Sequence, residues 1–104
     1  MISCSGSTIL FDSNEINSIE IKASATKQEI VINDKNVISV FVNDYINKNK
    51  KNISKFLSSH SVIFNYGGEE ILIITNGFSI KCKGKTYKLK KNIDEFISTL
   101  YNLD

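Results

Sequence analysis

The densest group of reactive side chains in this sequence is a cluster of lysines near the C-terminus. Ammonium groups at this density attract anions, either the carboxylates of an acidic protein or the phosphates of a nucleic acid. The chain contains no arginine, so the bidentate guanidinium contact used for sequence-specific reading of nucleic acid is absent. Alternatively, the lysines only protect an exposed sheet edge from aggregation. The cluster spans eleven residues and contains Lys81, Lys83, Lys85, Lys88, Lys90 and Lys91.

Residue types that support catalysis or metal binding are few. His60 is the only histidine, and a zinc site needs three or four ligands. Each of the carboxylate pairs Glu69-Glu70 and Asp94-Glu95 consists of sequence neighbours, whose side chains point to different sides. We therefore expect no catalytic site, no metal and no cofactor.

The two cysteines, Cys4 and Cys82, are far apart in the sequence. Cys82 falls on an apolar strand face, where free cysteine packs as a small hydrophobic residue. The spacing favours two reduced thiols in a cytoplasmic protein, with a disulfide between them as the alternative. Cys4-Ser-Gly-Ser also resembles the start of a mature bacterial lipoprotein, which would tether the domain outside the cytoplasm. No signal peptide precedes Cys4, so this reading requires the chain to be part of a longer protein.

Composition indicates one soluble domain. With 104 residues, 41% of them hydrophobic, the chain can bury a single core. The net charge is only +2, and no apolar run is long enough to span a membrane. Isoleucine, asparagine and lysine are over-represented, as in proteins of an AT-rich bacterium or its phage.

Three tight-turn signals between residues 61 and 90 predict a four-stranded antiparallel meander. The signals are Gly67-Gly68, Asn76-Gly77 and Gly84-Lys85. If each turn has two residues, the expected cross-strand pairs are Phe64 with Ile71, Ile73 with Ile80, Cys82 with Tyr87 and Lys81 with Lys88. One face of the meander then carries Val62, Phe64, Ile71, Ile73, Phe78, Ile80, Cys82, Tyr87 and Leu89. The other face grades from Ile63, Leu72 and Ile74 to Ser79, Lys81, Lys83 and Lys88.

The spacing of apolar residues predicts the remaining strands and helices. Residues 8–11 could form a short first strand, and residues 19–23 and 29–32 form a strand pair. Asn33-Asp34 caps a helix that buries Val37, Val40, Phe41 and Tyr45, with Ile38 and Val42 widening the stripe. After a polar break at 47–52, a short helix turns Ile53, Phe56 and Leu57 inward. The last helix starts at Asn92, with Glu95 completing a capping box, and buries Ile93, Phe96, Ile97, Leu100 and Tyr101.

These elements predict an α+β fold in which the C-terminal helix packs on an antiparallel sheet. Residues 1–7 form a flexible tail, and residues 8–104 form one domain. The element order resembles small inhibitor and adaptor folds with a curved antiparallel sheet. We expect a non-enzymatic protein-binding domain, of inhibitor or immunity type, that meets an acidic protein through the outer face of its sheet. The expected contact residues are Lys81, Lys83, Lys85, Lys88, Lys90, Ile63, Leu72 and Ile74.

Three alternatives remain open. The lysines could bind nucleic acid weakly and without sequence preference, although Phe78 and Tyr87 are expected to point inward, which leaves no aromatic platform for bases. The chain could be the lipid-anchored extracytoplasmic domain described above. Ile63, Leu72 and Ile74, if exposed, could instead form the interface of a homodimer.

Overall fold

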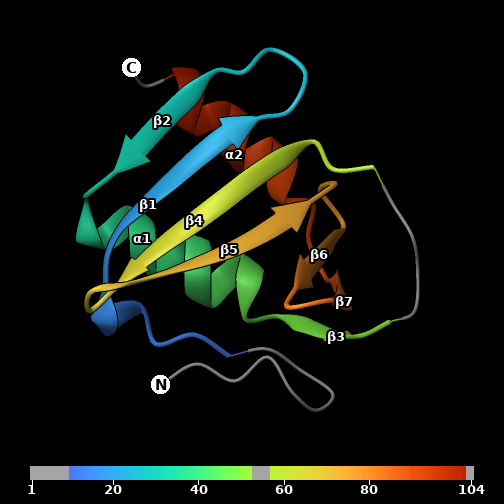
Figure 1. Cartoon of the computed structure of the whole chain (residues 1–104), viewed down its shortest axis with the longest axis horizontal. Helices are drawn as coiled ribbons and strands as arrows, with labels where there is room; N and C mark the ends of the chain where they lie inside the picture. The colour runs from blue at the N-terminus through green and yellow to red at the C-terminus, as the bar shows by residue number, and fades with distance from the viewer. Residues whose placement is uncertain (1–9, 53–56, 103–104) are drawn as a thin grey trace.

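One antiparallel sheet of seven strands forms the framework of the molecule (Figure 1). The structure is a computed structural model of the chain and describes residues 10–52 and 57–102. The strands are β1 (Ile16–Ala23), β2 (Glu29–Ile32), β3 (Asn49–Lys51), β4 (His60–Tyr66), β5 (Glu69–Thr75), β6 (Ser79–Cys82) and β7 (Lys85–Leu89). Their order across the sheet is β2-β1-β4-β5-β6-β7-β3, and every neighbouring pair is antiparallel. The expected α+β class is confirmed.

The sheet is larger than the predicted meander. The expected strand pair does not stand apart, because β1 pairs with β4 along most of its length, from Ile16 opposite Tyr66 to Ala23 opposite His60. The polar stretch expected to be a break contains β3, which pairs with β7 and forms the second border of the sheet. The meander is therefore the centre of a continuous sheet.

The register within the meander is right in one hairpin and shifted in two. Phe64 faces Ile71 across β4 and β5, as predicted. Across β5 and β6, however, Ile73 faces Cys82 and not Ile80. Thr75 faces Ile80, so four residues, and not two, lie between the last paired residues of β5 and β6.

The side chain of Asn76 explains the longer connection between β5 and β6. Its amide oxygen accepts hydrogen bonds from the backbone N–H groups of Phe78 and Ser79, at 3.1 and 2.8 Å. These bonds stabilise a wider turn than the Asn-Gly signal predicts. Phe78 lies within that turn and is 52% exposed, so its predicted inward position is wrong.

In the β6–β7 hairpin, the turn residues are Lys83 and Gly84, both with positive φ. Ile80 therefore faces Tyr87, Cys82 faces Lys85, and Lys81 faces Thr86. The predicted pair of Lys81 with Lys88 is wrong. The shift is by two positions, which keeps Ile80, Lys81, Cys82, Tyr87 and Lys88 on their predicted faces, whereas Lys83 lies in the turn.

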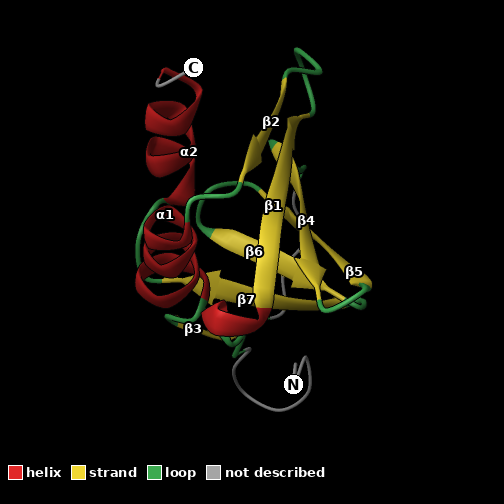
Figure 2. Ribbon diagram, turned by 90° about the vertical axis from the view of Figure 1, so that its left-hand side faces the viewer, coloured by secondary structure: helices red, strands yellow, loops and turns green. Residues whose placement is uncertain are grey.

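The described helices all lie on one side of the sheet (Figure 2). A short 3-10 turn, η1 (Ser13–Glu15), precedes β1, and α1 (Lys35–Val40) continues directly into a π-helical segment, η2 (Phe41–Ile46). Asp34 caps α1 by accepting from Asn36 and Val37, as predicted. The buried stripe is rotated from the predicted one, since Val40 is 39% exposed. The buried residues of α1 and η2 are Ile38, Phe41, Val42 and Ile46.

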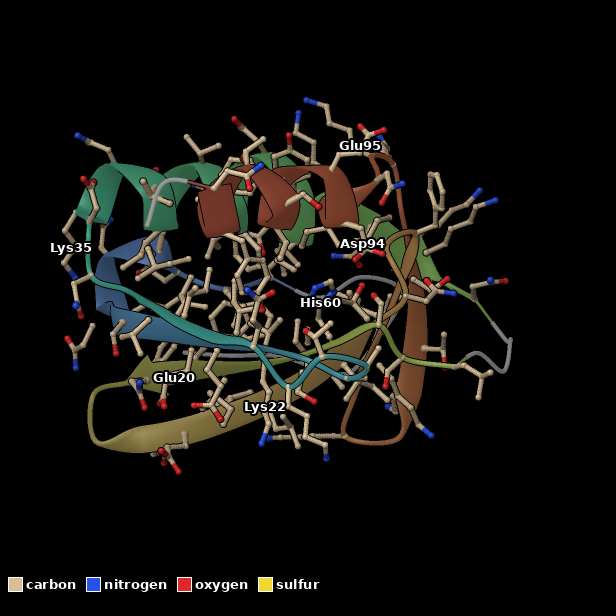
Figure 3. All side chains as sticks on the ribbon, turned by 90° about the horizontal axis from the view of Figure 1, so that it is seen from above. Glu20, Lys22, Lys35, His60, Asp94 and Glu95 are labelled. Carbon is tan, nitrogen blue, oxygen red and sulfur yellow. The ribbon has the colours of Figure 1, made fainter. Side chains whose placement is uncertain are left out.

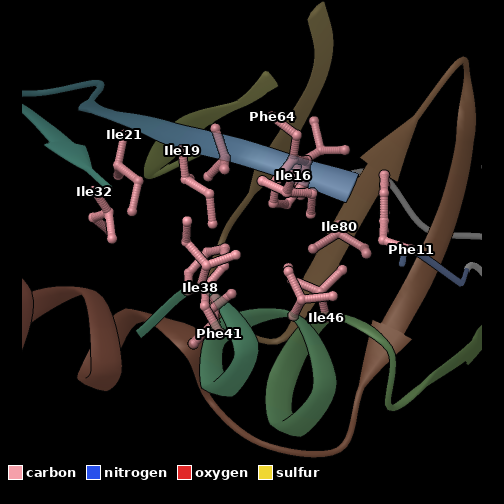
Figure 4. Close-up of a cluster of buried hydrophobic side chains, with 14 of the residues drawn as sticks. Phe11, Ile16, Ile19, Ile21, Ile32, Ile38, Phe41, Ile46, Phe64 and Ile80 are labelled. Atoms are coloured by element: carbon pink, nitrogen blue, oxygen red, sulfur yellow. The ribbon is translucent and has the colours of Figure 1, made fainter. Parts of the chain in front are cut away.

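The core lies between these helices and the inner face of the sheet (Figure 4). Phe41 of η2 packs near Phe64 of β4, with ring centroids 6.2 Å apart. Phe64 in turn contacts Phe11, whose ring lies 4.8 Å away. All the residues predicted for the inner face of the meander except Phe78 are buried.

The C-terminal helix α2 (Ile93–Asn102) is fixed to the sheet at its first turn. Asn92 caps it by accepting from the N–H of Asp94, and the Ile93 N–H donates to the carbonyl of Gly77. Gly77 has a φ of +105°, and a Cβ there would lie 2.7 Å from Asn92 Oδ1. Only glycine allows this approach. Ile93, Ile97 and Leu100 are buried as predicted.

Several predictions fall wholly or partly outside the described residues. These are the tail at 1–7, Cys4, half of the expected strand at 8–11 and most of the expected helix around 53–57. Leu57 is described, and at 94% exposure it does not turn inward.

Candidate functional site: the open face of the sheet

The side of the sheet away from the helices forms the candidate site, which we call the open face. In Figure 2 the helices lie on one side, and no described helix covers the other. Figure 3 shows Glu20 and Lys22 of β1 projecting away from the helices on this open side. The alternation of side chains along each strand places the members of this face.

Apolar side chains form a row across the open face. Val31 of β2 is opposite Glu20 of β1, Glu20 is opposite Ile63 of β4, and Ile63 is opposite Leu72 of β5. Val31 is 58% exposed and Leu72 is 56% exposed. Ile74, two residues further along β5, and Ile63 are half-buried. The three predicted apolar contact residues therefore share one accessible surface.

A hollow interrupts this row above β1. It has a volume of about 110 Å³ and lies between Val31 and Ile63, with Glu20 and Lys22 among its lining residues. The Glu20 carboxylate is held there by a hydrogen bond from the Asn65 side chain at 3.0 Å. The hollow can receive a small apolar side chain of a partner beside a fixed negative charge.

The charge of the side chains differs from one end of the open face to the other. At one border, Glu29 of β2 forms an ion pair with Lys22 of β1, 3.4 Å away, next to Glu20. Beyond the apolar row, Ile74 lies opposite Lys81 of β6. The face is thus mixed in charge at β1 and β2, apolar at β4 and β5, and basic from β6 onward.

The structure divides the predicted lysine cluster. Lys81 and Lys88 are exposed on the open face. Lys83, in the β6–β7 turn, lines a shallow groove with Glu69, Glu70 and Leu72. Lys85 lies two residues before Tyr87 on β7, so both side chains are on the same face of the sheet, the helix side. Lys90 follows the end of β7, where its N–H donates to the Lys48 carbonyl.

Sequence reasoning missed Val31 and Lys50 as members of the open face. The alternation in Glu29–Ile32 shows that Val31 points away from Ile30 and Ile32, but only the β1–β4 pairing brings it beside Ile63. Lys50 comes from β3 and lies directly opposite Lys88. The like-charge pair expected at Lys81 and Lys88 therefore exists between Lys50 and Lys88.

A second cluster of chemically active residues lies on the helix side, where β4 begins. His60 Nδ1 is 3.0 Å from Ser59 Oγ and 3.2 Å from Asp94 Oδ1. Ser59 Oγ is also within 3.1 Å of both carboxylate oxygens of Asp94. Figure 3 shows His60 and Asp94 together between α2 and the sheet. Tyr101 stacks on His60 with ring centroids 6.1 Å apart.

The geometry of this cluster differs from that of a nucleophilic triad. In a triad, serine and carboxylate bind opposite nitrogens of the imidazole, so that the ring takes the serine proton. Here Ser59 and Asp94 both lie at Nδ1, and the serine is also in contact with the carboxylate. The arrangement instead ties the start of β4 to the first turn of α2, which places His60 at a helix terminus.

Cys82 departs from its expected chemical state. It is fully buried on β6, as predicted, but it is disulfide-bonded. The expectation of reduced thiols is therefore wrong for Cys82. The only other cysteine of the sequence, Cys4, lies outside the described residues.

Within residues 10–52 and 57–102, no group of three or more histidine, cysteine or acidic side chains is arranged to hold a metal ion. No helix of this part of the chain has the length and apolar character needed to cross a membrane. Comparison with protein-family models, curated proteins and solved structures found no match to this chain.

Proposed function

We propose that this chain is a small protein-binding domain, of inhibitor or immunity type, that holds an acidic partner protein against its open face. The observation that carries the proposal is the row of accessible apolar side chains, Val31, Ile63 and Leu72, next to basic strands. Interfaces of this kind use apolar groups for affinity and charged groups for approach and orientation.

The charge gradient gives the proposed partner an orientation. Its acidic groups would face Lys81 and Lys88, and its apolar centre would cover Ile74 and Leu72. Among the described residues, no carboxylate forms an ion pair with Lys81 or Lys88. Their charges are available to a partner without breaking an internal contact.

Binding, and not catalysis, is the role we propose for the open face. The apolar row carries no nucleophile, and the serine nearest to the histidine lies at the same imidazole nitrogen as the carboxylate. We assign no catalytic residue.

The test is capture of partners from a nuclease-treated native extract with tagged protein. Lys81→Glu together with Lys88→Glu, and separately Leu72→Asp, should each release a partner that the unaltered protein retains. Lys91→Glu is the matched control, because it changes the charge as much per residue but lies over the Tyr45 ring of η2, 5.6 Å from its centroid. A partner that all variants retain equally would place the interface elsewhere.

Single-stranded nucleic acid is a second candidate ligand, and the exposure of Phe78 favours it. No aromatic platform was expected from the sequence, whereas Phe78 is 52% exposed and its carbonyl accepts from the Leu89 N–H. The exposed Lys88 and Lys90 flank that contact. Binding by stacking and phosphate contacts predicts a steep salt dependence and loss on Phe78→Ala. Absence of a salt slope in a titration with oligonucleotide would eliminate this candidate.

The disulfide of Cys82 favours an oxidising compartment over the cytoplasm expected from the sequence. Alkylation of the protein in fresh cell fractions, with and without reduction, tests this: labelling only after reduction supports an extracytoplasmic location. The lipid-anchor alternative rests on Cys4, outside the described residues. A lipidated cysteine has no thiol left for a disulfide, so mass analysis distinguishes these two states.

A further inference from the structure

The strand β2 forms a border of the sheet, and no other described strand pairs with the outer side of its backbone. Its one neighbour among the described strands is β1, with Ile21 opposite Ile30 and Ile19 opposite Ile32. The N–H of Ala23 donates to the Gln28 carbonyl at 2.9 Å. This bond shows which opposed residues of β1 and β2 form hydrogen-bonded pairs and which do not.

The alternation of hydrogen-bonded pairs between β1 and β2 identifies the backbone groups of β2 that point away from β1. In an antiparallel pair, opposed residues alternate between hydrogen-bonded and non-hydrogen-bonded pairs. Counting from the bonded pair of Ala23 and Gln28, the backbone groups of Ile30 and Ile32 point toward β1. Those of Glu29 and Val31 point away, and no hydrogen bond from another described residue reaches them.

A groove lined by apolar side chains and by the polar Asn33 and Asp34 follows this unpaired edge on the helix side. It has a volume of about 240 Å³ and contains side chains from β2, α1 and α2. Ile30 and Ile32 form one wall, and Val37 and Leu100 belong to the helices opposite. The groove continues around the strand to Val31, which belongs to the open face.

We propose that β2 accepts an extended segment of a partner protein as an eighth strand of the sheet. Its backbone would pair with the outward N–H and C=O groups of Glu29 and Val31. Alternate side chains of an added strand point to opposite faces, so one apolar side chain would enter the groove while its neighbours lie beside Val31. This inference concerns the sheet edge and does not rest on the function proposed for the lysine-bearing face.

The occupant is an extended segment and not the β2 strand of a second copy. Ile30 and Ile32 of a second copy are each only 8% exposed, because they are already packed in their own core. They have no free surface with which to fill the groove of another molecule. A segment from a partner carries side chains that are not yet buried.

The test uses short linear peptides selected from a phage-displayed library on the immobilised full chain. Binding of the synthetic peptides is then followed by NMR on isotope-labelled protein. We expect the Glu29 and Val31 amides to shift and to become protected from hydrogen exchange. Val31→Pro removes one outward N–H without removing a bond to β1, and should weaken binding about tenfold or more. Val31→Ile, the control, keeps the N–H and should bind within about threefold of the unaltered protein.

A second variant covers the case in which Val31→Pro fails to fold. Val37→Lys places a cation in the groove and should weaken peptide binding, whereas Asn36→Lys adds the same charge at the neighbouring exposed position and should not. Lys81→Glu should leave peptide affinity unchanged, which separates this site from the open face.

Three results would overturn the proposal. The first is a selection that yields no peptide protecting the Glu29 and Val31 amides. The second is peptide affinity that survives Val31→Pro or Val37→Lys. The third is a free protein that is already dimeric, with the Val31 amide protected in the absence of peptide.

Discussion

The two faces of the sheet present similar side chains to opposite environments. In β5, Ile73 is fully buried beneath the helices, while the adjacent Leu72 is 56% exposed. The difference does not come from hydrophobicity, which is nearly equal, but from the placement of α1, η2 and α2 on one side only. The inner face therefore provides stability, and the open face keeps apolar surface available for contact.

The largest expected effect tests this difference within one strand. Ile73→Ala should lower the free energy of unfolding by about 2–5 kcal/mol, because it leaves a cavity in the core. Leu72→Ala, its neighbour, should change it by about 0.5 kcal/mol or less. Urea unfolding followed by circular dichroism measures both. Equal losses would show that the open face is covered in solution.

The next effect concerns the attachment of α2 to the sheet. Asp94→Ala removes the carboxylate that contacts Ser59 and His60 and should cost about 1–3 kcal/mol. Glu95→Ala removes the same charge from an exposed neighbour and should cost about 0.5 kcal/mol or less. If thermal unfolding gives the same midpoint for both variants, the Asp94 contacts do not hold the helix layer in place.

Alkaline pH should weaken the helix-covered side. Burial, together with the nearby Glu29 charge, raises the pKa of the Tyr101 phenol above its ordinary value. The folded state therefore keeps this proton longer than the unfolded state. The resulting stability is complete below the unfolded pKa of about 10 and is lost as the pH rises through the folded pKa. Tyr101→Phe should make stability less dependent on pH in that range, as measured by urea unfolding at a series of pH values. An unchanged dependence would contradict the assignment.

The smallest effect belongs to the open face. Lys50 and Lys88 lie directly opposite each other, and like charges in that position repel. Lys50→Gln should raise stability by about 0.2–0.5 kcal/mol at low salt. The gain should disappear at about 1 M salt, where screening is strong. A loss of stability at low salt would mean that an unseen anion or carboxylate compensates the pair.

Face assignment was largely predictable from the sequence, whereas exact register was not. Gly67 and Gly68 both adopt positive φ, so the two-residue turn holds and Phe64 meets Ile71. At Asn76 the side chain bonds to the backbone and lengthens the turn, which no dipeptide signal encodes. Errors of two residues leave the alternation of side chains along each strand unchanged, so most residues keep their predicted face. Phe78, inside the turn, is exposed, and Ser79, predicted on the outer face, is buried.

Long-range pairing was the part of the candidate site that the sequence could not supply. Val31 joins Ile63 and Leu72 only because β1 lies between β2 and β4. Lys50 joins Lys88 because a short polar segment becomes the border strand β3. Neither pairing has a turn signal, since the partners are separated by whole elements.

The strand order also has a consequence for the sequence of folding events. Strands β4 to β7 are consecutive hairpins, whose loops close quickly, whereas β1 and β3 must find partners far along the chain. We expect β4–β7 to form the folding nucleus and the two flanking parts to join later. Substitutions at Ile73 should then slow refolding, and those at Ile30 should mainly speed unfolding. High φ-values at Ile30 would contradict this order. Until β1 arrives, the edge of β4 is unpaired, and at that stage the nascent chain is most exposed to aggregation.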